Sequence, residues 1–457
     1  MSSTSLIDDF ATRRAAVRRF RGLLAHHADD LVRLMDEEIN KPGFEALASD
    51  VLPLLSACVW HERHAARVLR DRRIPGKPLW LVGVRHRVHR APLGRVAIIA
   101  TWNYPVQLVG IQIVQAFIAG NTLLVKPSER SPRTQALLLD LFERAGIAVE
   151  RAPATRDAGE TLVREADFDH LVFTGSTAVG RAIARVLAER LIPSTLELSG
   201  NDTAVVLASA DANLAARSVW YALTLNHGQT CMAPRRALVE PAIMERFLRE
   251  LRTLADPASP RRLIDAEAAD VCRRVARAAI EAGGELVVGD PESDPLTPII
   301  IANAGEETAL FRGKHFGPLL AVERLENSGS GLPARHVLHP TDPLTLSVFG
   351  TKHESRRWSS LASAGTVTSN DAIIPTGHPG APLGAVGESG WGVSRGVEGL
   401  LAMTRPVSMS TTRKKLRLPL DPPGTPVSKI TPWLRRLYAA GRAGDGAAST
   451  STRREDA

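Results

Sequence analysis

The chain has 457 residues, and because a single hydrophobic core stops growing near roughly 250–300 residues, we expect two large domains. An apolar fraction of 44%, with 35 glycines and 30 prolines, is ordinary for a folded α/β protein and excludes the disordered and fibrous classes. The net charge of +8 comes from basic residues interleaved with acids, and no arrangement of aromatic residues between the basic ones suggests a base-stacking platform. A solvated surface therefore explains the charge better than a nucleic-acid platform, and we expect no nucleic-acid partner.

The three cysteines, Cys58, Cys231 and Cys272, have no repeating spacing. They predict neither a disulfide framework nor a metal site, and they indicate a reducing, cytoplasmic location. The N-terminal segment has acids and no apolar run, and no stretch reaches the ~20 apolar residues of a membrane span. We expect neither export nor membrane insertion.

Apolar residues at helical spacing from Phe10 to about Arg70 predict a helical N-terminal layer with a break at Lys41 and Pro42. The segment 78–92 changes to alternation, which predicts an exposed two-stranded ribbon. Short apolar runs then alternate with helical patterns, and the strand candidates are RVAIIAT, NTLLVKP and HLVFTG. This alternation predicts βαβ units around a parallel sheet, and a second segment at about 200–375 repeats the mixed pattern.

The C-terminal segment changes character after Arg405. One strand and a Pro-rich linker are expected there, and 417–457 is predicted to be a disordered tail. Within it, ITPWLRRLYAAG is predicted to form one or two amphipathic, basic turns. Three interpretations stay open for these turns: a transient helix, docking on the chain's own domain, or weak contact with a membrane surface.

Chemistry-bearing residues follow several of the predicted strands. Gly175 and Gly180 in FTGSTAVG sit at a strand-to-helix turn, where backbone N–H groups can approach a phosphate. Lys126 and Glu129 in LLVKPSER follow another strand of the same sheet, at the edge where open α/β sheets bind ligands. Two such loops on one sheet favour a phosphate-containing ligand over packing alone.

Three further residues have ordinary structural explanations when each is taken alone. Asn103 in ATWNYP is a turn former, Glu197 in TLELSGND is a helix-entry or turn residue, and Cys231 is a small buried side chain. However, Cys231 lies in LNHGQTCMAPRR, a polar, Gly-containing stretch and not an apolar stripe. A nucleophilic thiol needs such a reachable place.

Together these motifs resemble the aldehyde dehydrogenase superfamily, particularly its shorter, class-3-like members. From about Arg13 to about Arg405 the chain carries, in the family's order, PLGRVAIIATWNYP, GNTLLVKPSE, FTGSTAVG, LELSGND, NHGQTC, FGP and PLGAVGESGWG. The resemblance implies an aldehyde dehydrogenase-like α/β fold of two doubly wound domains and a homodimer. The implied parts are a Rossmann-type cofactor domain at 1–77 and 93–198 with 379–403 returning to it, a catalytic domain at 199–378, and an oligomerisation ribbon at 78–92 and 404–416.

The resemblance also implies roles for individual residues. Cys231 would attack the aldehyde carbonyl, the Asn103 amide and the Cys231 N–H would hold the oxyanion, and Glu197 would activate water. The implied cofactor-binding residues are Thr101, Trp102, Lys126, Ser128, Glu129, Gly175, Ser176, Gly180, Lys314 and Phe316. NAD is the expected cofactor because Glu129 would repel a 2′-phosphate, and NADP stays the alternative because Arg130 lies next to it.

Three positions depart from the family's pattern. Lys314 in GKHFGP replaces a glutamate that holds the ribose hydroxyls of the nicotinamide half, and an ammonium cannot accept a hydrogen bond from a hydroxyl. We therefore expect impaired hydride transfer. Ser199 and Asn201 stand where glycine and lysine are usual; Ser199 is expected near the nicotinamide, and Asn201 on the surface.

The leading hypothesis is oxidation of a small aldehyde to a carboxylic acid with NAD, through a cysteine thiohemiacetal and a thioester. One alternative is a thioester- or ester-hydrolysing or acyl-transferring relative that makes little use of NAD. The other is a catalytically silent scaffold with the same fold. NADH formation with a panel of aldehydes identifies the first, and hydrolysis of p-nitrophenyl acetate without NAD identifies the second.

Overall fold

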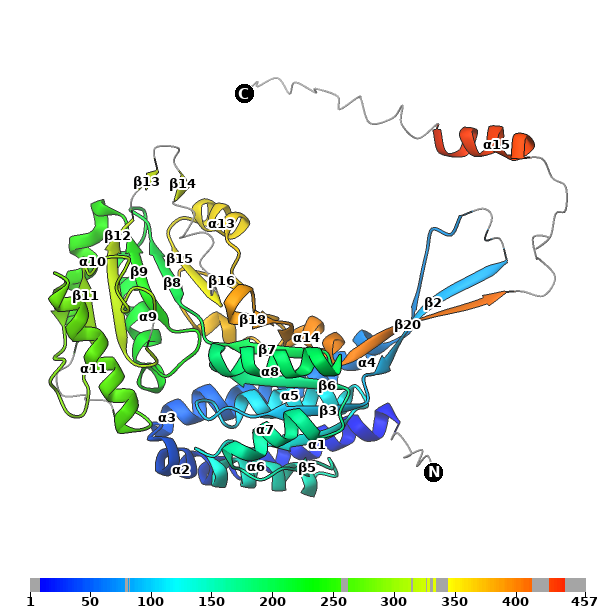
Figure 1. Ribbon diagram of the computed structural model, residues 1–457, viewed down its shortest axis with the longest axis horizontal. Helices are drawn as coiled ribbons and strands as arrows, with labels where there is room; N and C mark the ends of the chain where they lie inside the picture. Colours follow the sequence, from blue (N-terminus) through cyan, green and yellow to red (C-terminus); the bar gives the residue numbers. More distant parts are fainter. Residues whose placement is uncertain are drawn as a thin grey trace, which may run out of the picture. The chain divides into compact units, whose positions relative to one another are not determined.

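The computed structural model describes residues 9–78, 81, 83–255, 262–313, 315–325, 327–328, 332–333, 344–412 and 427–439 (Figure 1). The chain divides into two compact units. The first contains Met1–Arg70 and His89–Val407, and the second contains Asp71–Val88 and Ser408–Ala457. The first unit holds both large sheets and every candidate site residue that the structure describes.

A six-stranded sheet with the order β18-β7-β6-β3-β4-β5 forms the first half of this unit. Its strands are parallel except β18, which runs antiparallel to β7. Their bounds are β3 Arg95–Ile99, β4 Thr122–Lys126, β5 Glu150–Arg151, β6 His170–Gly175, β7 Ser194–Leu198 and β18 Gly390–Trp391. The strands predicted from the three apolar runs are confirmed as β3, β4 and β6.

Helices cover both faces of this sheet because successive side chains of each strand point to opposite sides. Val96 and Ile98 of β3 pack into a core with α1, α2, α4, α5, α6 and α14, whereas Ala97 and Ile99 pack with α7 and α8 on the other face. The helices are α1 Phe10–His26, α2 Ala28–Ile39, α3 Gly43–Ala46, η1 Leu47–Val51, α4 Leu52–Leu69, α5 Gln107–Ile118, α6 Pro132–Arg144, α7 Arg156–Glu165, α8 Thr177–Arg190 and α14 Gly396–Ala402.

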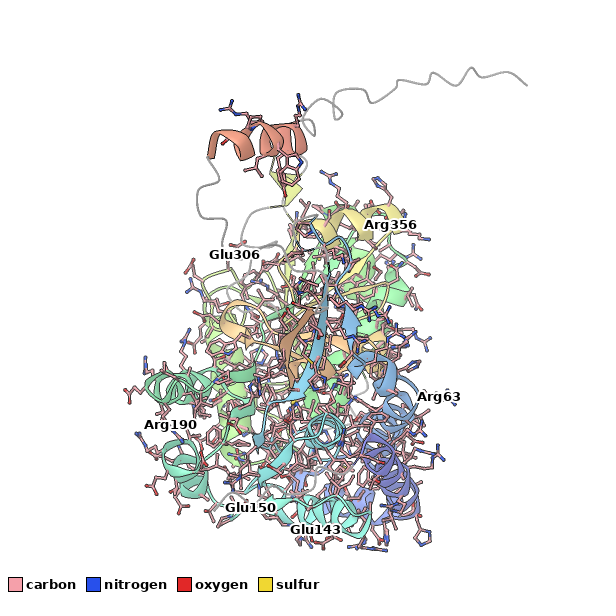
Figure 2. All side chains as sticks on the ribbon, turned by 90° about the vertical axis from the view of Figure 1, so that its right-hand side faces the viewer. Arg63, Glu143, Glu150, Arg190, Glu306 and Arg356 are labelled. Atoms are coloured by element: carbon pink, nitrogen blue, oxygen red, sulfur yellow. The ribbon has the colours of Figure 1, made fainter. Side chains whose placement is uncertain are left out.

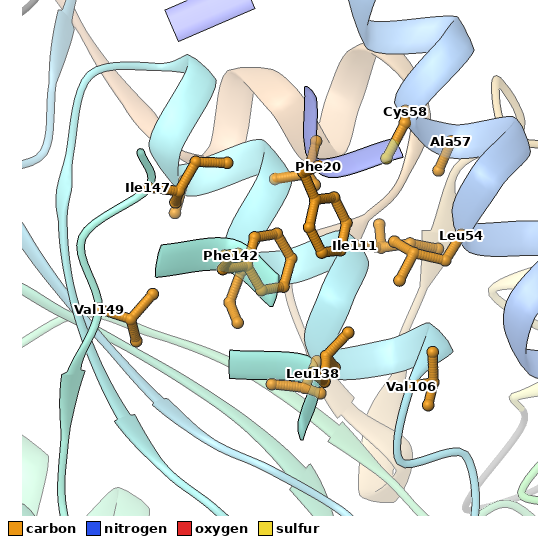
Figure 3. Packing of buried hydrophobic residues seen from close by; sticks show 14 of the residues in the cluster. Phe20, Leu54, Ala57, Cys58, Val106, Ile111, Leu138, Phe142, Ile147 and Val149 are labelled. Carbon is orange, nitrogen blue, oxygen red and sulfur yellow. The ribbon is translucent and has the colours of Figure 1, made fainter. Parts of the chain in front are cut away.

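The surface of this unit is charged and its interior is apolar. Charged side chains such as Arg63, Glu143 and Glu150 point outward, as a solvated surface requires (Figure 2). In the core beneath them, Phe20 of α1 stacks on Phe142 of α6 with ring centroids 3.7 Å apart (Figure 3). This contact packs α1 of the N-terminal helical layer against α6, which covers the six-stranded sheet.

The helical stretch Gly43–Leu69 is long and apolar enough to cross a membrane by length and composition, although no such stretch was expected from the sequence. Packing explains its apolar character. Leu54, Ala57 and Cys58 are at most 1% exposed and lie in the core with α1 and α5 (Figure 3).

A seven-stranded sheet with the order β10-β11-β12-β9-β8-β15-β16 forms the other half of the first unit. Its strands are parallel except β10. Helices α9 and α10 cover one face, and α11 and α13 cover the other. The bounds are β8 Asp202–Val206, α9 Ala212–Thr224, β9 Pro234–Val239, α10 Pro241–Leu254, α11 Ala266–Glu281, β10 Glu285–Val288, β11 Ile299–Ala302, β12 Leu319–Arg324, β15 Thr345–Phe349, α13 Lys352–Leu361 and β16 Thr366–Ser369.

The predicted doubly wound α/β fold is thereby confirmed, because each of the two large sheets has helices on both faces (Figure 1). Short elements complete this unit. They are η3 Leu225–Gly228, β13 Asn327–Ser328, β14 Leu332–Pro333, η4 Ile374–Gly377, β17 Leu383–Gly384, η5 Gly387–Ser389 and β19 Val393–Ser394.

The second unit contains a helix and most of a ribbon. Strands β1 Arg72–Arg73, β2 Val84–Pro92 and β20 Thr404–Thr412 form a sheet in the order β1-β2-β20, so the predicted ribbon has three strands and not two. The second unit includes β1, the part of β2 up to Val88 and the part of β20 from Ser408. Residues 427–439 form helix α15 Val427–Ala439, which is longer than the one or two turns predicted. The domain boundaries and the oligomerising role of the ribbon stay predictions.

Candidate active site

The carboxyl ends of four neighbouring strands meet at one edge of the six-stranded sheet. Ile99 of β3 is in register with Lys126 of β4 and with Phe173 of β6, and Gly175 is in register with Leu198 of β7. The segments that follow these strands carry the predicted site residues. Open α/β sheets bind ligands at this edge because the loops there diverge.

The candidate nucleophile follows an unusual turn. Asn226, His227 and Gly228 have consecutive left-handed φ values of 52°, 57° and 74°. At Gly228 an added Cβ would lie 2.4 Å from the Pro318 nitrogen, so only glycine fits between this turn and the segment that contains Pro318. The turn follows the end of α9, and the loop after it places Cys231 beside Glu197 of the six-stranded sheet.

Cys231, in the loop before β9 of the seven-stranded sheet, lies close to Glu197 on β7 of the six-stranded sheet. Its Sγ lies 3.9 Å from Glu197 Oε1, and Glu197 Oε2 has no hydrogen-bond partner among the described residues. Gly390 of β18 pairs with Glu197 and fixes the strand that carries it. The structure therefore brings two of the three predicted catalytic residues together and leaves one carboxylate oxygen unused.

Burial changes the acid–base properties of this pair. Burial raises the pKa of Glu197 above its ordinary value, and the positive charge of Arg395 opposes that effect. Burial also raises the pKa of the Cys231 thiol, and the nearby Glu197 carboxylate adds to the rise. Both effects favour the neutral thiol over the thiolate, so a nucleophilic role for Cys231 needs a base close to it.

Asn103, the third predicted catalytic residue, is 4% exposed and contacts the nucleophile loop directly. Its amide donates to the Gln229 carbonyl at 3.0 Å, and its Oδ1 accepts from the Thr101 hydroxyl at 2.9 Å. Among the described residues the amide nitrogen has this one acceptor, so its second N–H remains for another oxygen. The hydroxyl of the neighbouring Tyr104 shares a 2.6 Å hydrogen bond with the Thr230 hydroxyl of the same loop.

A buried ion pair that sequence reasoning missed supports Asn103. Lys41 and Asp50 are both fully buried, and the Lys41 ammonium donates to Asp50 at 2.5 Å and to the Asn103 carbonyl at 3.2 Å. Asp50 also accepts from the backbone N–H groups of Val106 and Gln107 at the start of α5. The sequence marked Lys41 only as a helix break, because no local pattern reveals a partner nine residues away.

Lys126, Ser128 and Glu129, three of the predicted cofactor-binding residues, lie at and just after the end of β4. Lys126 donates to the Glu129 carboxylate at 2.5 Å, and the Ser128 hydroxyl accepts from the Arg130 N–H at 3.2 Å. The Arg130 guanidinium is engaged elsewhere, since it donates to Asp265 at 2.6 Å and lies 5.8 Å from the centre of the Trp102 ring.

The glycine turn has a packing reason that the sequence did not reveal. An added Cβ would lie 2.4 Å from the Phe173 ring at Gly175, and 2.4 Å from Leu198 at Gly180. Gly180 therefore allows α8 to lie close to β7, and Gly175 leaves room for the Phe173 ring of its own strand. The exposed Ser176 caps α8 by accepting from Val179, and the first N–H groups of the helix remain open to an anion.

Phe316 lies beside the nucleophile loop. Its ring is 6.0 Å from the Trp102 ring in an edge-on arrangement, and the Arg235 guanidinium lies 5.4 Å from its centre. Lys314, the remaining predicted cofactor residue, lies outside the described residues.

The placement of Asn201 corrects a prediction. Asn201 is 5% exposed and not a surface residue; its amide donates to the Phe311 carbonyl at 3.1 Å, and its oxygen lies against Gly313. The short turn after β7 directs it inward, which the sequence spacing did not show. Ser199 is half-buried and follows Glu197 by two residues in the chain.

The other two cysteines are buried in helices of the two cores, Cys58 in α4 and Cys272 in α11. Burial raises the pKa of Cys272 to about 11. Neither of these two thiols lies on a loop, in contrast to Cys231.

Proteins of known structure share this fold. The fold matches the substrate-bound state of Staphylococcus aureus AldH with a TM-score of 0.83 at 22% identity, over 95% of this chain and 96% of that one. That likeness defines the fold as the aldehyde dehydrogenase type. The family model described as "Aldehyde dehydrogenase family" matches residues 8–409, and the chain belongs to this family.

Two curated relatives cover most of the same region. A 4,4'-diapolycopene aldehyde oxidase of Methylomonas sp is 30% identical over 90% of this chain and 80% of its own length. A coniferyl aldehyde dehydrogenase of Pseudomonas sp. (strain HR199 / DSM 7063) is 32% identical over 69% of each chain. These relatives support an oxidoreductase that acts on aldehydes.

Proposed function

We propose that this protein oxidises an aldehyde to a carboxylic acid with NAD, through a covalent intermediate on Cys231. The observation that carries the proposal is the 3.9 Å approach of the Cys231 Sγ to the buried Glu197 carboxylate. A thiol needs a base within reach to become a nucleophile, and a base whose pKa is raised toward neutrality accepts the proton more effectively.

Glu197 takes the proton of the thiol as Cys231 Sγ forms a bond to the carbonyl carbon. The oxygen of that carbonyl gains the negative charge, and the Asn103 amide N–H and the Cys231 backbone N–H stabilise it. Loss of hydride from the same carbon leaves a thioester. Glu197 releases the thiol proton to solvent, and the restored carboxylate removes a proton from water. The hydroxide attacks the thioester carbon, the carboxylic acid forms, and the departing Cys231 thiolate takes its proton from Glu197.

NAD supplies the hydride acceptor in this scheme. The residues at the carboxyl ends of β3, β4 and β6 fit such a cofactor. The open N–H groups at the start of α8 suit its pyrophosphate, and the paired Lys126 and Glu129 suit hydroxyls of a ribose. Thr101, Trp102, Ser128, Gly175, Ser176, Gly180, Lys314 and Phe316 complete the proposed binding set.

The charges near Glu129 support NAD over NADP. A 2′-phosphate beside the Glu129 carboxylate would be repelled, and a cation would have to compensate. Arg130 is the nearest candidate in the sequence, but it is paired with Asp265 and packed against Trp102. We propose that its charge is not free to hold a phosphate, so the preference for NAD follows.

The names of the relatives support an extended apolar or aromatic aldehyde as substrate, since they act on carotenoid and coniferyl aldehydes by name. Membership of the class-3-like branch, a homodimer and a cytoplasmic location are proposed with it on the sequence motifs.

The test measures NADH formation with a panel of aldehydes, with NAD and NADP at matched concentrations. We expect NADH formation with aromatic or long-chain aldehydes and loss of it in Cys231→Ser. Hydrolysis of p-nitrophenyl acetate without NADH formation would favour the ester-hydrolysing alternative. Absence of both signals in a folded protein would favour the silent scaffold.

A further inference from the structure

Arg235, on β9 four residues after Cys231, is a buried arginine that the proposed mechanism does not use. It is 1% exposed. Its Nη1 donates to the carbonyls of Gly228 at 3.0 Å and Gly317 at 2.8 Å, and its Nη2 donates to the carbonyl of Thr230 at 2.8 Å. The acceptors are therefore all on the main chain, and they belong to two different loops.

The two loops carry different parts of the site. The first loop, 225–233, holds Cys231, and the second, 315–318, holds Phe316. They lie side by side because β9 and β12, the strands that follow them, are neighbours in the seven-stranded sheet. The guanidinium thus joins the backbone on both sides of the nucleophile to the backbone next to Phe316.

The stability of the core does not explain an arginine at this position. A guanidinium removed from water costs several kcal/mol unless a well-placed partner compensates, and an apolar side chain would avoid that cost. No carboxylate hydrogen-bonds to Arg235 in the part of the chain that the structure describes. What arginine supplies is a rigid, planar fork of donors, which a single ammonium or an apolar side chain lacks.

Aromatic contacts extend the arrangement beyond the two loops. The Arg235 guanidinium lies 5.4 Å from the centre of the Phe316 ring, which packs edge-on against Trp102 at 6.0 Å. Trp102 precedes Asn103, the proposed oxyanion donor. Arg235 is therefore connected by contacts to the nucleophile, to the Phe316 loop and to the segment that carries Asn103.

We propose that Arg235 is a positioning residue for the reaction: it holds the Cys231 loop and the Phe316 loop in one fixed arrangement and places a buried positive charge behind the thiol. This inference rests on the proposed function, in which Cys231 is the nucleophile. It adds a residue that contacts neither substrate nor cofactor, and it separates two contributions, the donor fork and the charge.

The charge contribution has a direction. The positive charges of Arg395 and Arg235 lower the pKa of the Cys231 thiol, against burial and nearby carboxylates that raise it. Removing the Arg235 charge therefore moves thiol ionisation to higher pH. The charged and titratable groups that face Cys231 are Glu197 from β7, Asp202 from β8, Tyr104 from the segment after β3, Arg395 before α14 and Arg235 from β9.

The test compares Arg235→Met, which removes fork and charge, with Arg235→Lys, which keeps the charge and loses the fork. Alkylation of Cys231 by iodoacetamide is measured from pH 6 to pH 10 with peptide mapping, and the rate at each pH reports the fraction of thiolate. In Arg235→Met we expect the alkylation profile to move to higher pH and the rate at neutral pH to fall about tenfold. In Arg235→Lys we expect a wild-type alkylation profile.

Turnover separates the fork from the charge. In Arg235→Lys we expect kcat to fall about 10²-fold with little change in the aldehyde KM, because the thiol is misplaced while binding is kept. A role in stability alone would leave the alkylation profile and the ratio of kcat to KM unchanged.

Arg190 offers a matched control. It also donates to two main-chain carbonyls, those of Val163 and Ala166, and its guanidinium lies 5.0 Å from the Phe168 ring. It lies at the far end of α8 on the outside of the molecule (Figure 2). Arg190→Met should lose stability and keep both the alkylation profile and kcat.

Several outcomes overturn the inference. A folded Arg235→Met protein with wild-type alkylation and wild-type kcat excludes both contributions. If Arg235→Met does not fold, Arg235→Lys decides, and wild-type kcat in that variant excludes a role for the fork. The alkylation profile is measured without cofactor, so a wild-type protein that forms no NADH would contradict the proposed function while the test of Arg235 still stands.

Discussion

The Sγ of Cys231 lies 3.9 Å from Oε1 of Glu197, although the two residues are 34 positions apart and belong to segments of different sheets. Each sheet is built around its own core, so this approach depends on how the two halves of the first unit meet. The proposed chemistry therefore depends on tertiary structure more than on either motif alone.

Glu197→Gln should slow the second half of the reaction more than the first. The carboxylate is the proposed base in both halves, but losing its negative charge also lowers the pKa of the Cys231 thiol, which partly offsets the lost base in the attack step. We therefore expect steady-state turnover to fall by about 10²–10⁴-fold while a slower pre-steady-state burst of NADH remains. Stopped-flow absorbance measures the burst, and its disappearance in a folded variant would show that the attack depends on Glu197 as strongly as the hydrolysis does.

The pH dependence should report the raised pKa of Glu197. The base must be ionised in the free enzyme, so kcat/KM should fall on the acid side at a higher pH than an ordinary glutamate would give. Arg395 lowers the pKa of Glu197, so Arg395→Met should move this acid limb to still higher pH. The measurement is a kcat/KM profile of both proteins, and a shift toward lower pH would contradict the assigned charge interaction.

The buried Lys41–Asp50 pair should be needed for stability and for the position of Asn103. Breaking such a pair leaves an unpaired buried charge and typically costs about 3–5 kcal/mol, so Lys41→Met should lower the free energy of unfolding by that amount. The double variant Lys41→Met/Asp50→Leu should recover part of it. Urea denaturation measures both, and two independent, additive losses would show that the residues do not act as a pair.

Lys314→Glu should improve hydride transfer if Lys314 occupies the place of the family's glutamate. The carboxylate would accept from the ribose hydroxyls, and a charge would be removed that repels the cationic nicotinamide by about 4 kcal/mol at ~4 Å and an effective dielectric of 20, before screening. We expect kcat with NAD to rise more than the NAD dissociation constant changes. Stopped-flow kinetics and calorimetry measure these, and an unchanged or slower hydride step would indicate another use for the lysine.

The sequence by itself determined the secondary structure and the fold class, because the relevant forces act locally. Alternation and helical spacing of apolar residues correctly predicted β3, β4, β6 and the helices between them. The order of the motifs led to the family that the comparisons then showed. Asn103, Glu197 and Cys231 were selected for the same reason, since each stands in a short motif.

Only the tertiary structure decided how these residues act on one another. Burial depends on the packing of distant segments, so no local pattern showed that the Cys231 thiol has a raised pKa, that Asn201 is buried, or that Arg130 is held by Asp265. Lys41 and Arg235 were missed for the same reason. Their acceptors are buried main-chain carbonyls and a carboxylate that folding brings close. A hydrogen bond to such a group depends on the position of the acceptor in space, and the spacing of residues in the sequence does not show it.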